Sequence, residues 1–326
     1  MYLNFYGFQE KPFSATPDPR FLYMTPEHRE ALAQLVYSVE DNRGFLVLTG
    51  EVGTGKTTLL HALLERLDAK TAAALIFNST LPFDGILETM LRDFGLPTDG
   101  VSAAERLRTL SRFLRDRRSQ GLGAVLIVDE AQNLSPETLE QVRLLSNFET
   151  PREKLLQILL VGQPELAAKL QLPSLRQLRQ RVEFFCTTPA LSREQTREYI
   201  LTRLRVAGAR DVGVFTDRAV ARIARHTGGI PRLINILCDH SLVIGYAEQK
   251  RRIDTDIVQQ AVTYLDQGRR PVAVPADGRW QRMTAHRWAL GALVAAIAGG
   301  IAILPWVPEA HQLLDVARLA RDLLIR

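Results

Sequence analysis

Residues 50–58 form a glycine-rich segment whose residue types are suited to binding phosphate groups. Residues 50–57 read GEVGTGKT, which fits the pattern GxxxxGK followed by Ser or Thr. Glycines let the backbone wrap closely, so that several N–H groups can point at phosphate oxygens. The ammonium group of Lys56 would contact the β- and γ-phosphates, and the hydroxyl of Thr57 would bind Mg²⁺. The residues expected to line this phosphate-binding loop are Gly50, Glu51, Val52, Gly53, Thr54, Gly55, Lys56, Thr57 and Thr58.

Two adjacent acids, Asp129 and Glu130, directly follow the apolar run 124–128. A buried strand at this run would deliver both acids to the carboxyl end of a sheet, where open α/β sheets bind their ligands. Asp129 would hold Mg²⁺ directly or through water, and Glu130 would polarise an attacking water. A pair of acids with these roles predicts hydrolysis of the bound triphosphate as well as binding.

Further polar residues could act on the same phosphates. Gln163 follows a predicted strand and could contact the γ-phosphate or the attacking water, although it could instead stabilise a turn. Arg232 closes the segment GGIPR at 228–232 and could reach the γ-phosphate from a separate helical domain, or it could be a surface arginine. An arginine before the last predicted strand could act across a subunit boundary. The candidates are Arg181, then Arg179, in a cluster that also holds Arg176.

Short apolar runs alternate with amphipathic helical segments up to residue 190. The runs are rich in β-branched residues and lack charge, which is typical of strands buried on both faces of a parallel sheet. The predicted strands are 45–49, 73–78, 124–128, 155–161 and 182–187. The predicted helices are 26–41, 56–67, 83–94, 102–118, 136–147 and 175–180. This alternation predicts a P-loop α/β domain over residues 26–190.

The strand pattern stops after Pro189. The segments 192–206, 216–226, 231–248 and 255–266 each read as a helix. Ser192 and Thr216 are suitable N-caps, and Pro231 suits a first helical turn. We therefore predict an all-helical lid domain over residues 191–266. Residues 1–25 are rich in proline and aromatic residues, and we predict an extended arm that lies over the first domain.

The rest of the composition limits the class of protein. Hydrophobic residues make up 46% of the chain and charged residues 24%, as in ordinary globular proteins. The net charge of +5 is too small to indicate nucleic-acid binding by itself. Cys186 and Cys238 are too few for a disulfide scaffold, so we expect small buried side chains in a reduced compartment. The first twelve residues lack the features of a signal peptide.

The C-terminal part changes character after residue 266. Residues 267–287 lack periodicity and are predicted to be a basic linker. Residues 288–307 read WALGALVAAIAGGIAILPWV and carry no charge, which predicts a transmembrane helix with tryptophans at both membrane interfaces. The alternative is a buried helix of a soluble domain. Arginines before the helix and acids after it place the N-terminal bulk of the chain in the cytoplasm and residues 308–326 outside it as a short tail.

The two motifs, the segment GGIPR and the predicted helical lid together resemble an AAA+ ATPase. The resemblance is closer to the ExeA-type ATPases of the general secretion pathway protein A family. Relatives of these ATPases occur in exopolysaccharide and exosortase-associated loci and in pilus biogenesis. It covers about residues 1–266. The segments that carry it are MYLNFYGFQEKPFSATPDPRFLY, GFLVLTGEVGTGKTT, VDEAQNL, LLQILLVGQPEL, LRQLRQRV and GGIPRLIN.

This resemblance implies specific roles. ATP would be the nucleotide, Gln163 would be sensor 1, Arg232 would be sensor 2, and the arginine finger would lie within 176–181. It also implies ring-like homo-oligomers with ATP at subunit interfaces. Many relatives continue into a peptidoglycan-binding domain beyond a single membrane span, but here only 308–326 follow the predicted span, so direct peptidoglycan binding is not expected.

The expected function is therefore a single-pass ATPase of the inner membrane that uses Mg·ATP to assemble or export a cell-envelope component, together with envelope partner proteins. The component could belong to a secretion apparatus, a pilus or an exopolysaccharide. One alternative is an AAA+ ATPase acting on DNA, of the transposition-helper type, although nucleic-acid binding is not expected. Another is a nucleotide-gated switch that scarcely hydrolyses ATP.

Overall fold

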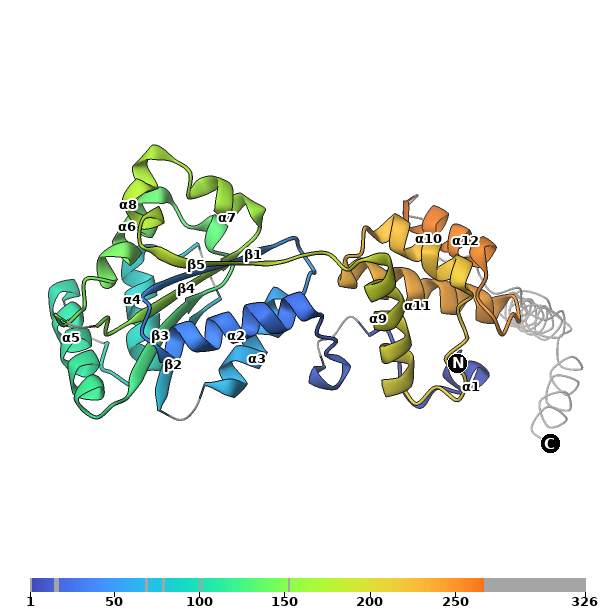
Figure 1. Cartoon of the computed structure of the whole chain (residues 1–326), viewed down its shortest axis with the longest axis horizontal. Coiled ribbons are helices and arrows are strands. Elements are labelled where there is room, and N and C mark those ends of the chain that lie inside the picture. Colours follow the sequence, from blue (N-terminus) through green and yellow to red (C-terminus); the bar gives the residue numbers. More distant parts are fainter. Residues whose placement is uncertain are drawn as a thin grey trace, which may run out of the picture. The chain divides into compact units, whose positions relative to one another are not determined.

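The computed structural model describes residues 2–14, 18–67, 70–77, 80–98, 100, 102–151 and 153–266 (Figure 1). The predicted linker 267–287, membrane helix 288–307 and tail 308–326 lie outside the described residues. Within the described ranges, no helix combines the length and the apolar composition that crossing a membrane requires.

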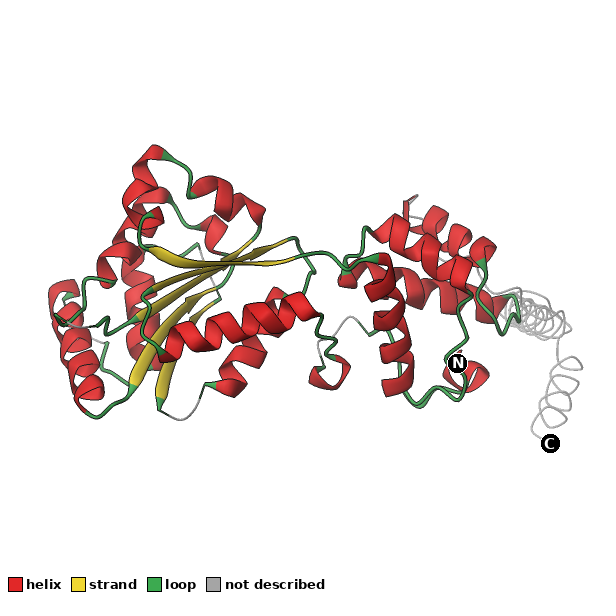
Figure 2. Ribbon diagram, viewed as in Figure 1, coloured by secondary structure: helices red, strands yellow, loops and turns green. Residues whose placement is uncertain are grey.

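Five parallel strands form one sheet in the order β2-β3-β4-β1-β5 (Figure 2). They are β1 (Phe45–Gly50), β2 (Thr71–Ile76), β3 (Gly123–Val128), β4 (Gln157–Gly162) and β5 (Val182–Thr188). β1 and β4 are buried along their whole length, as expected of strands covered on both faces. The predicted α/β fold with a parallel sheet is therefore confirmed. β2 begins earlier than predicted, because Thr71 and Ala72 join the ladder despite their weak hydrophobic signal.

Alternate residues of the strands face two different layers of helices. Leu46 and Leu48 pack in one apolar cluster with residues of α2 (Pro26–Glu40) and α3 (Lys56–Arg66). Phe45 and Val47 pack in another, which includes residues of α4 (Phe83–Asp93), α5 (Ala103–Ser119) and α6 (Pro136–Leu145). The result is a three-layer domain. Its shorter elements are η2 (Ala131–Asn133), α7 (Pro164–Lys169), η3 (Pro173–Leu175) and α8 (Arg176–Arg179), the last two replacing the predicted helix 175–180.

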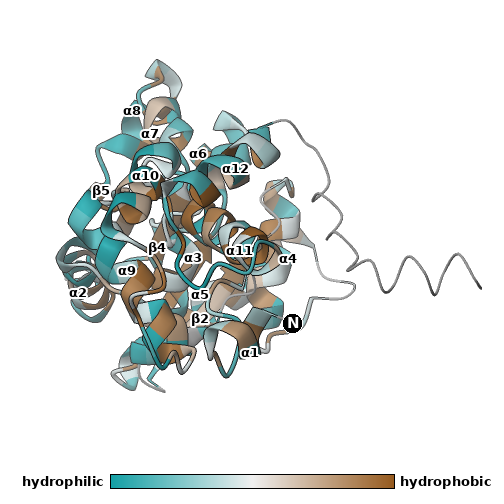
Figure 3. Ribbon diagram, turned by 90° about the vertical axis from the view of Figure 1, so that its right-hand side faces the viewer, coloured by the Kyte–Doolittle hydropathy of each residue, from teal (hydrophilic) through white to brown (hydrophobic). Residues whose placement is uncertain are grey.

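A helical bundle follows the sheet domain, as predicted. Its helices are α9 (Arg193–Val206), α10 (Asp217–Thr227), α11 (Pro231–Ala247) and α12 (Thr255–Asp266). Ser192 forms a capping box with Gln195, and the Thr216 hydroxyl accepts from the N–H of Ala219. Figure 3 shows polar and apolar residues side by side on these helices, so that each has an apolar side to bury. Cys186 and Cys238 are buried and free, as expected.

The N-terminal arm was predicted to be extended and to lie over the first domain, but it begins with a helix and its buried aromatic residues pack in the bundle instead. Residues Tyr2–Tyr6 form the helix α1, and Tyr2, Tyr6, Phe8 and Phe13 are buried in the apolar cluster of the bundle. The hydroxyl of Tyr6 donates to the carbonyl of Lys250 at 3.0 Å. The first proline comes only at position 12, so one helical turn can form before it. The arm therefore completes the core of the bundle.

The chain returns from the bundle to the sheet domain through residues 18–25. The short helix η1 (Pro19–Phe21) lies against α9, where the guanidinium of Arg203 stacks over the ring of Phe21 at 4.7 Å. The Nε of Arg203 donates to the carbonyl of Pro12 at 2.5 Å. Thr25 then caps α2 by accepting from the N–H of His28. One buried arginine thus joins both halves of the arm to the bundle.

The start of α11 is fixed by a close approach between Gly229 and Leu191. The N–H of Leu191 donates to the carbonyl of Gly229 at 2.9 Å. Gly229 has φ +76°, and a Cβ there would lie 2.0 Å from the carbonyl oxygen of Leu191. A residue without a side chain is therefore required at this position. This contact ties the first turn of α11, which carries Arg232, to the segment by which the chain enters the bundle.

Candidate functional site

The phosphate-binding loop joins the carboxyl end of β1 to the start of α3, as the sequence predicts. The loop is braced by the hydroxyl of Thr54, which donates to the carbonyl of Glu51 at 2.9 Å and lies 2.9 Å from the hydroxyl of Thr188 at the end of β5. Because α3 begins at Lys56, its first N–H groups have no acceptor within the helix. Such N–H groups and the positive end of the helix dipole make this position suitable for an anion.

The Lys56 side chain is buried beneath the loop, with the residue only 6% exposed. Its ammonium donates to the carbonyls of Gly50 at 2.7 Å and Glu51 at 3.0 Å. Burial lowers the pKa of Lys56, and the negative charges of Glu130 and Asp129 oppose that shift. The ammonium is therefore close enough to both acids to interact with them electrostatically.

Asp129 and Glu130 follow β3 directly, and they differ in their surroundings. Asp129 is buried, and it accepts the N–H of Glu130 at 2.9 Å. Burial is the main cause that raises the pKa of Asp129. Glu130 is half-buried and has a left-handed backbone with φ 51°. Burial raises its pKa, but hydrogen bonds from Gln132 and Gln163 and the charge of Lys56 outweigh burial, so the pKa of Glu130 is lowered.

Gln163 lies between the loop and the acids because β4 lies between β1 and β3 in the sheet. Its Nε2 donates to Oε2 of Glu130 at 3.0 Å. Gln163 is the N-cap of α7, but its side chain makes no capping hydrogen bond. The side chain is thus directed to the acid and does not stabilise the turn. The carboxyl ends of the strands thus bring together the side chains of Lys56, Asp129, Glu130 and Gln163.

Arg232 reaches the loop from the bundle. The N–H of Arg232 lies 3.4 Å from the carbonyl of Gly53, and a Cβ on Gly53 would lie 2.6 Å from the Cβ of Arg232. The first turn of α11 therefore packs directly on the phosphate-binding loop. The Arg232 side chain is exposed. Its position allows it to reach a phosphate in the loop.

The three candidate finger arginines lie far from this loop. They precede β5, whose first residue Val182 pairs with Phe45 at the start of β1, whereas the loop follows the end of β1. Six residues of strand separate the two positions by about 20 Å. The guanidinium of Arg181 donates to the hydroxyl of Ser146, and that of Arg179 to the side chain of Gln171. Arg176 is exposed.

Sequence reasoning missed two residues at the site, His28 and Gln132. The Nε2 of His28 lies 3.1 Å from the carbonyl of Thr54, and Nδ1 lies 2.8 Å from the hydroxyl of Thr25. A carbonyl can only accept, so Nε2 carries the proton and Nδ1 accepts from Thr25. His28 therefore braces the phosphate-binding loop from α2. The only sequence signal for it was Thr25 before Pro26, which marks a helix start.

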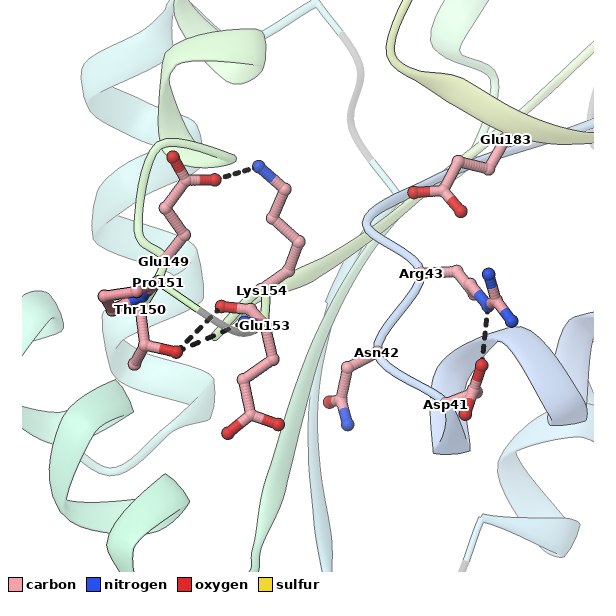
Figure 4. A pocket seen from close by; sticks show the side chains of 9 residues that line it. All are labelled: Asp41, Asn42, Arg43, Glu149, Thr150, Pro151, Glu153, Lys154 and Glu183. Carbon is pink, nitrogen blue, oxygen red and sulfur yellow. Dashed lines mark hydrogen bonds and ion pairs between the residues drawn. The ribbon is translucent and has the colours of Figure 1, made fainter.

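A charged recess lies at the opposite end of the strands, away from the phosphate-binding loop (Figure 4). Its charges are largely paired: Arg43 with Asp41 at 2.6 Å, and Lys154 with Glu149. The recess is at the amino ends of β1 and β4, where open α/β sheets do not bind ligands. It is lined by Asp41, Asn42, Arg43, Glu149, Thr150, Pro151, Glu153, Lys154 and Glu183. We assign it no part in the phosphate site.

The donors present suit Mg²⁺ bound together with phosphate. Among the residues that the structure describes, no three His, Cys, Asp or Glu side chains gather as a metal site. Mg²⁺ at nucleotides needs fewer protein ligands, because phosphates and waters supply the rest. Thr57 in the first turn of α3 and Asp129 after β3 are oxygen donors of that kind.

Comparisons with known proteins agree with this geometry. Residues 39–170 match a family model described as an AAA domain. The chain is 40% identical over 304 residues to general secretion pathway protein A of Aeromonas hydrophila, over 93% of this chain and 53% of that protein. Among solved structures, Cdc6p of Pyrobaculum aerophilum matches with TM-score 0.58 and 22% identity, over 77% of this chain and 70% of that one. ORC2 of Aeropyrum pernix matches with TM-score 0.54 and 19% identity, over 78% and 71%.

The sheet order, the phosphate-binding loop and the acids after β3 define an AAA-type P-loop domain, which a helical bundle follows in the sequence. Residues 39–170 are thus similar to an AAA domain, and the chain is similar to general secretion pathway protein A over most of its own length. It spans about half the length of that relative.

Replacing His28 tests its role in bracing the loop. We expect His28→Ala to lower the free energy of unfolding by about 1–3 kcal/mol, because the buried carbonyl of Thr54 loses its donor. It should also weaken binding of a fluorescent ATP analogue, because the loop is less ordered. Urea unfolding and a binding titration measure both effects.

The exposed His61 on α3 provides the matched control, and His61→Ala should change stability by no more than about 0.5 kcal/mol. His28→Gln keeps a side-chain N–H and should recover part of the loss. Equal stability and affinity in His28→Ala and the unchanged protein would contradict this role.

Proposed function

We propose that this protein binds Mg·ATP in the loop 50–58 and hydrolyses it. The observation that carries the proposal is the convergence of one buried ammonium, two acids and one amide at the carboxyl edge of the sheet. Lys56 lies near both acids, and Gln163 donates to Glu130. This combination supplies the cationic, metal-binding and water-orienting groups that phosphoryl transfer needs.

Each residue has a distinct proposed role. Lys56 would donate to the β- and γ-phosphates in place of the carbonyls of Gly50 and Glu51. Thr57 and Asp129 would hold Mg²⁺, which neutralises charge on the phosphate oxygens. Glu130 would orient and polarise the attacking water, since its lowered pKa keeps it ionised near neutral pH. Gln163 and Arg232 would contact the γ-phosphate from the sheet domain and the bundle.

Substitutions of Lys56 and Glu130 separate binding from hydrolysis. Lys56→Ala should abolish the rise in melting temperature that Mg·ATP causes, since only a bound ligand stabilises the folded state. Glu130→Gln should keep that rise but lower turnover at least a hundredfold, because it acts on the transition state. Thermal unfolding and phosphate release measure the two effects, and excess EDTA should reduce turnover to background.

The exposed Glu137 on α6 gives a matched control, and Glu137→Gln should hydrolyse ATP at the rate of the unchanged protein. Unchanged turnover in both Lys56→Ala and Glu130→Gln would refute an ATPase at this site. Turnover at background in the unchanged protein would instead favour a nucleotide-gated switch.

We further propose that the protein forms a homo-oligomer with ATP between subunits. Its candidate finger arginines lie at the edge of the sheet opposite their own loop, so a phosphate contact would have to be made to a neighbouring subunit. Arg181 and Arg179 are the first candidates, in the same cluster as Arg176. An arginine finger in trans accelerates phosphoryl transfer by about 10³–10⁵ in other NTPases.

Mixing inactive variants identifies the finger. Turnover should fall in one of Arg176→Ala, Arg179→Ala and Arg181→Ala, and should partly return when that variant is mixed with Lys56→Ala. Each partner then supplies the element that the other lacks. A mixture of Lys56→Ala with Glu130→Gln is the control, since every site in it stays defective. No recovery with any of the three arginine variants would argue against a finger in this cluster.

We propose that residues 288–307 anchor the protein in the inner membrane, with the ATPase domain in the cytoplasm, and that it drives assembly or export of a cell-envelope component. Two observations support this proposal. One is the similarity to general secretion pathway protein A. The other is an uncharged segment of bilayer length that begins with Trp288 and ends one residue after Trp306.

Charges placed in this segment test the anchor. The full chain should sediment with membranes after a high-salt wash. Val294→Arg with Ile297→Arg should release much of it, because each arginine costs about 2.5–3.5 kcal/mol at the middle of a membrane helix. The control pair Val272→Arg with Val274→Arg in the linker should remain bound. A fully soluble unchanged protein would rule out the anchor.

A further inference from the structure

Gln132 lies in the short helix η2 immediately after the two acids, and neither sequence motif gives it a role. Its Nε2 donates to Oε2 of Glu130 at 2.6 Å. Its Oε1 accepts the backbone N–H of Gln163 at 3.1 Å. The same Glu130 oxygen also accepts from Nε2 of Gln163 at 3.0 Å. The side-chain amide of Gln132 thus links Glu130, which follows β3, to the backbone of Gln163, which follows β4.

The position of Gln132 is closely constrained by its neighbours. The ammonium of Lys169 on α7 donates to the carbonyls of Gln132 and Leu134, so η2 is bonded to α7. Gly162 precedes Gln163, and a Cβ there would lie 2.7 Å from Oε1 of Gln132. The Gln132 side chain therefore fills the space above the end of β4. Its amide has little freedom to leave Glu130 without moving these neighbours.

The hydrogen bonds divide the two oxygens of Glu130 between two tasks. Both amide donors use Oε2, while no described residue donates a hydrogen bond to Oε1. A neutral amide is a donor that cannot take up the proton of the carboxylate. It also stabilises the ionised form of Glu130. Oε1 is thus the oxygen that can accept a hydrogen bond from a water molecule.

We infer that Gln132 is a positioning residue for hydrolysis: it holds Oε2 of Glu130 against the Gln163 loop and leaves Oε1 to orient the attacking water. This inference rests on the proposed ATPase function and extends it to a residue outside both motifs. An amide is required because one group must donate to Glu130 and accept from Gln163 at the same time. A carboxylate at position 132 would repel Glu130. An aliphatic side chain could neither donate to Glu130 nor accept from Gln163.

The test compares Gln132→Met with the unchanged protein. Methionine keeps the length of the side chain and removes both hydrogen bonds. We expect kcat to fall by about one to two orders of magnitude, as for the loss of a hydrogen bond to a charged group. The Kd for Mg·ATP should stay within about threefold, because the hydrogen bonds of the Gln132 side chain go to Glu130 and Gln163 and not to the phosphate-binding loop. The exposed Gln141 supplies the control, and Gln141→Met should leave both constants unchanged.

A double substitution distinguishes positioning from general structural damage. If Gln132 acts through Glu130, Gln132→Met should lower residual single-turnover hydrolysis by no more than about twofold in a Glu130→Gln protein. Damage to the fold would lower it as much as in the unchanged background and would also reduce the melting temperature. Should Gln132→Met not fold, Gln132→Ala takes its place in the same cycle.

Three results would overturn the inference: a normal kcat in Gln132→Met, an equal loss in both backgrounds, or a loss confined to Kd. Failure of the proposed function gives a different pattern. In that case the unchanged protein does not hydrolyse ATP, or Glu130→Gln is fully active, whatever residue stands at position 132.

Discussion

The site depends on one electrostatic relation, in which a buried ammonium lies near two carboxylates that belong to a different strand. Lys56 stands after β1 and the acids stand after β3, with β4 between them. Burying these charges is costly. Lys56 and the two acids offset part of that cost for each other, whereas the two carboxylates repel one another. The parallel register makes the relation possible, because it ends the three strands at the same edge. The helices of both layers, in turn, are needed to keep those strands dry and aligned.

The parts of this arrangement that the sequence predicted are those with a local signal. The segment GEVGTGKT fixes its own loop geometry, and uncharged runs mark strands that are covered on both faces. The acids at 129 and 130 and Gln163 each come directly after such a run. Parallel strands share an edge, so their meeting could be expected before the strand order was known. The helical bundle followed from its caps at Ser192 and Thr216.

The parts that could not be predicted are contacts between distant segments. Gln132 meets Gln163 only because β4 inserts between β1 and β3, and no local pattern gives that order. His28 reads as an ordinary residue in the first turn of α2 until Thr54 is placed beside it. The aromatic arm packs in the bundle, which the sequence could not indicate, since its composition says that it must pack but not on what. Each case needs the tertiary fold before the role of the residue becomes visible.

The arm also has a consequence for movement within the molecule. Tyr2, Tyr6, Phe8 and Phe13 of the arm are part of the core of the bundle, and the chain continues through η1 and Thr25 into α2, whose His28 bonds to Thr54. The bundle itself meets the adjacent residue Gly53 through the start of α11. Of these two contacts, only that of α11 joins the bundle directly to the loop, because α2 packs on the sheet and its His28 bonds to Thr54 within the sheet domain. If the bundle turned against the sheet, the contact between Arg232 and Gly53 would have to break or pull the loop with it, whereas His28 could keep its bond to Thr54 and hold the loop on the sheet.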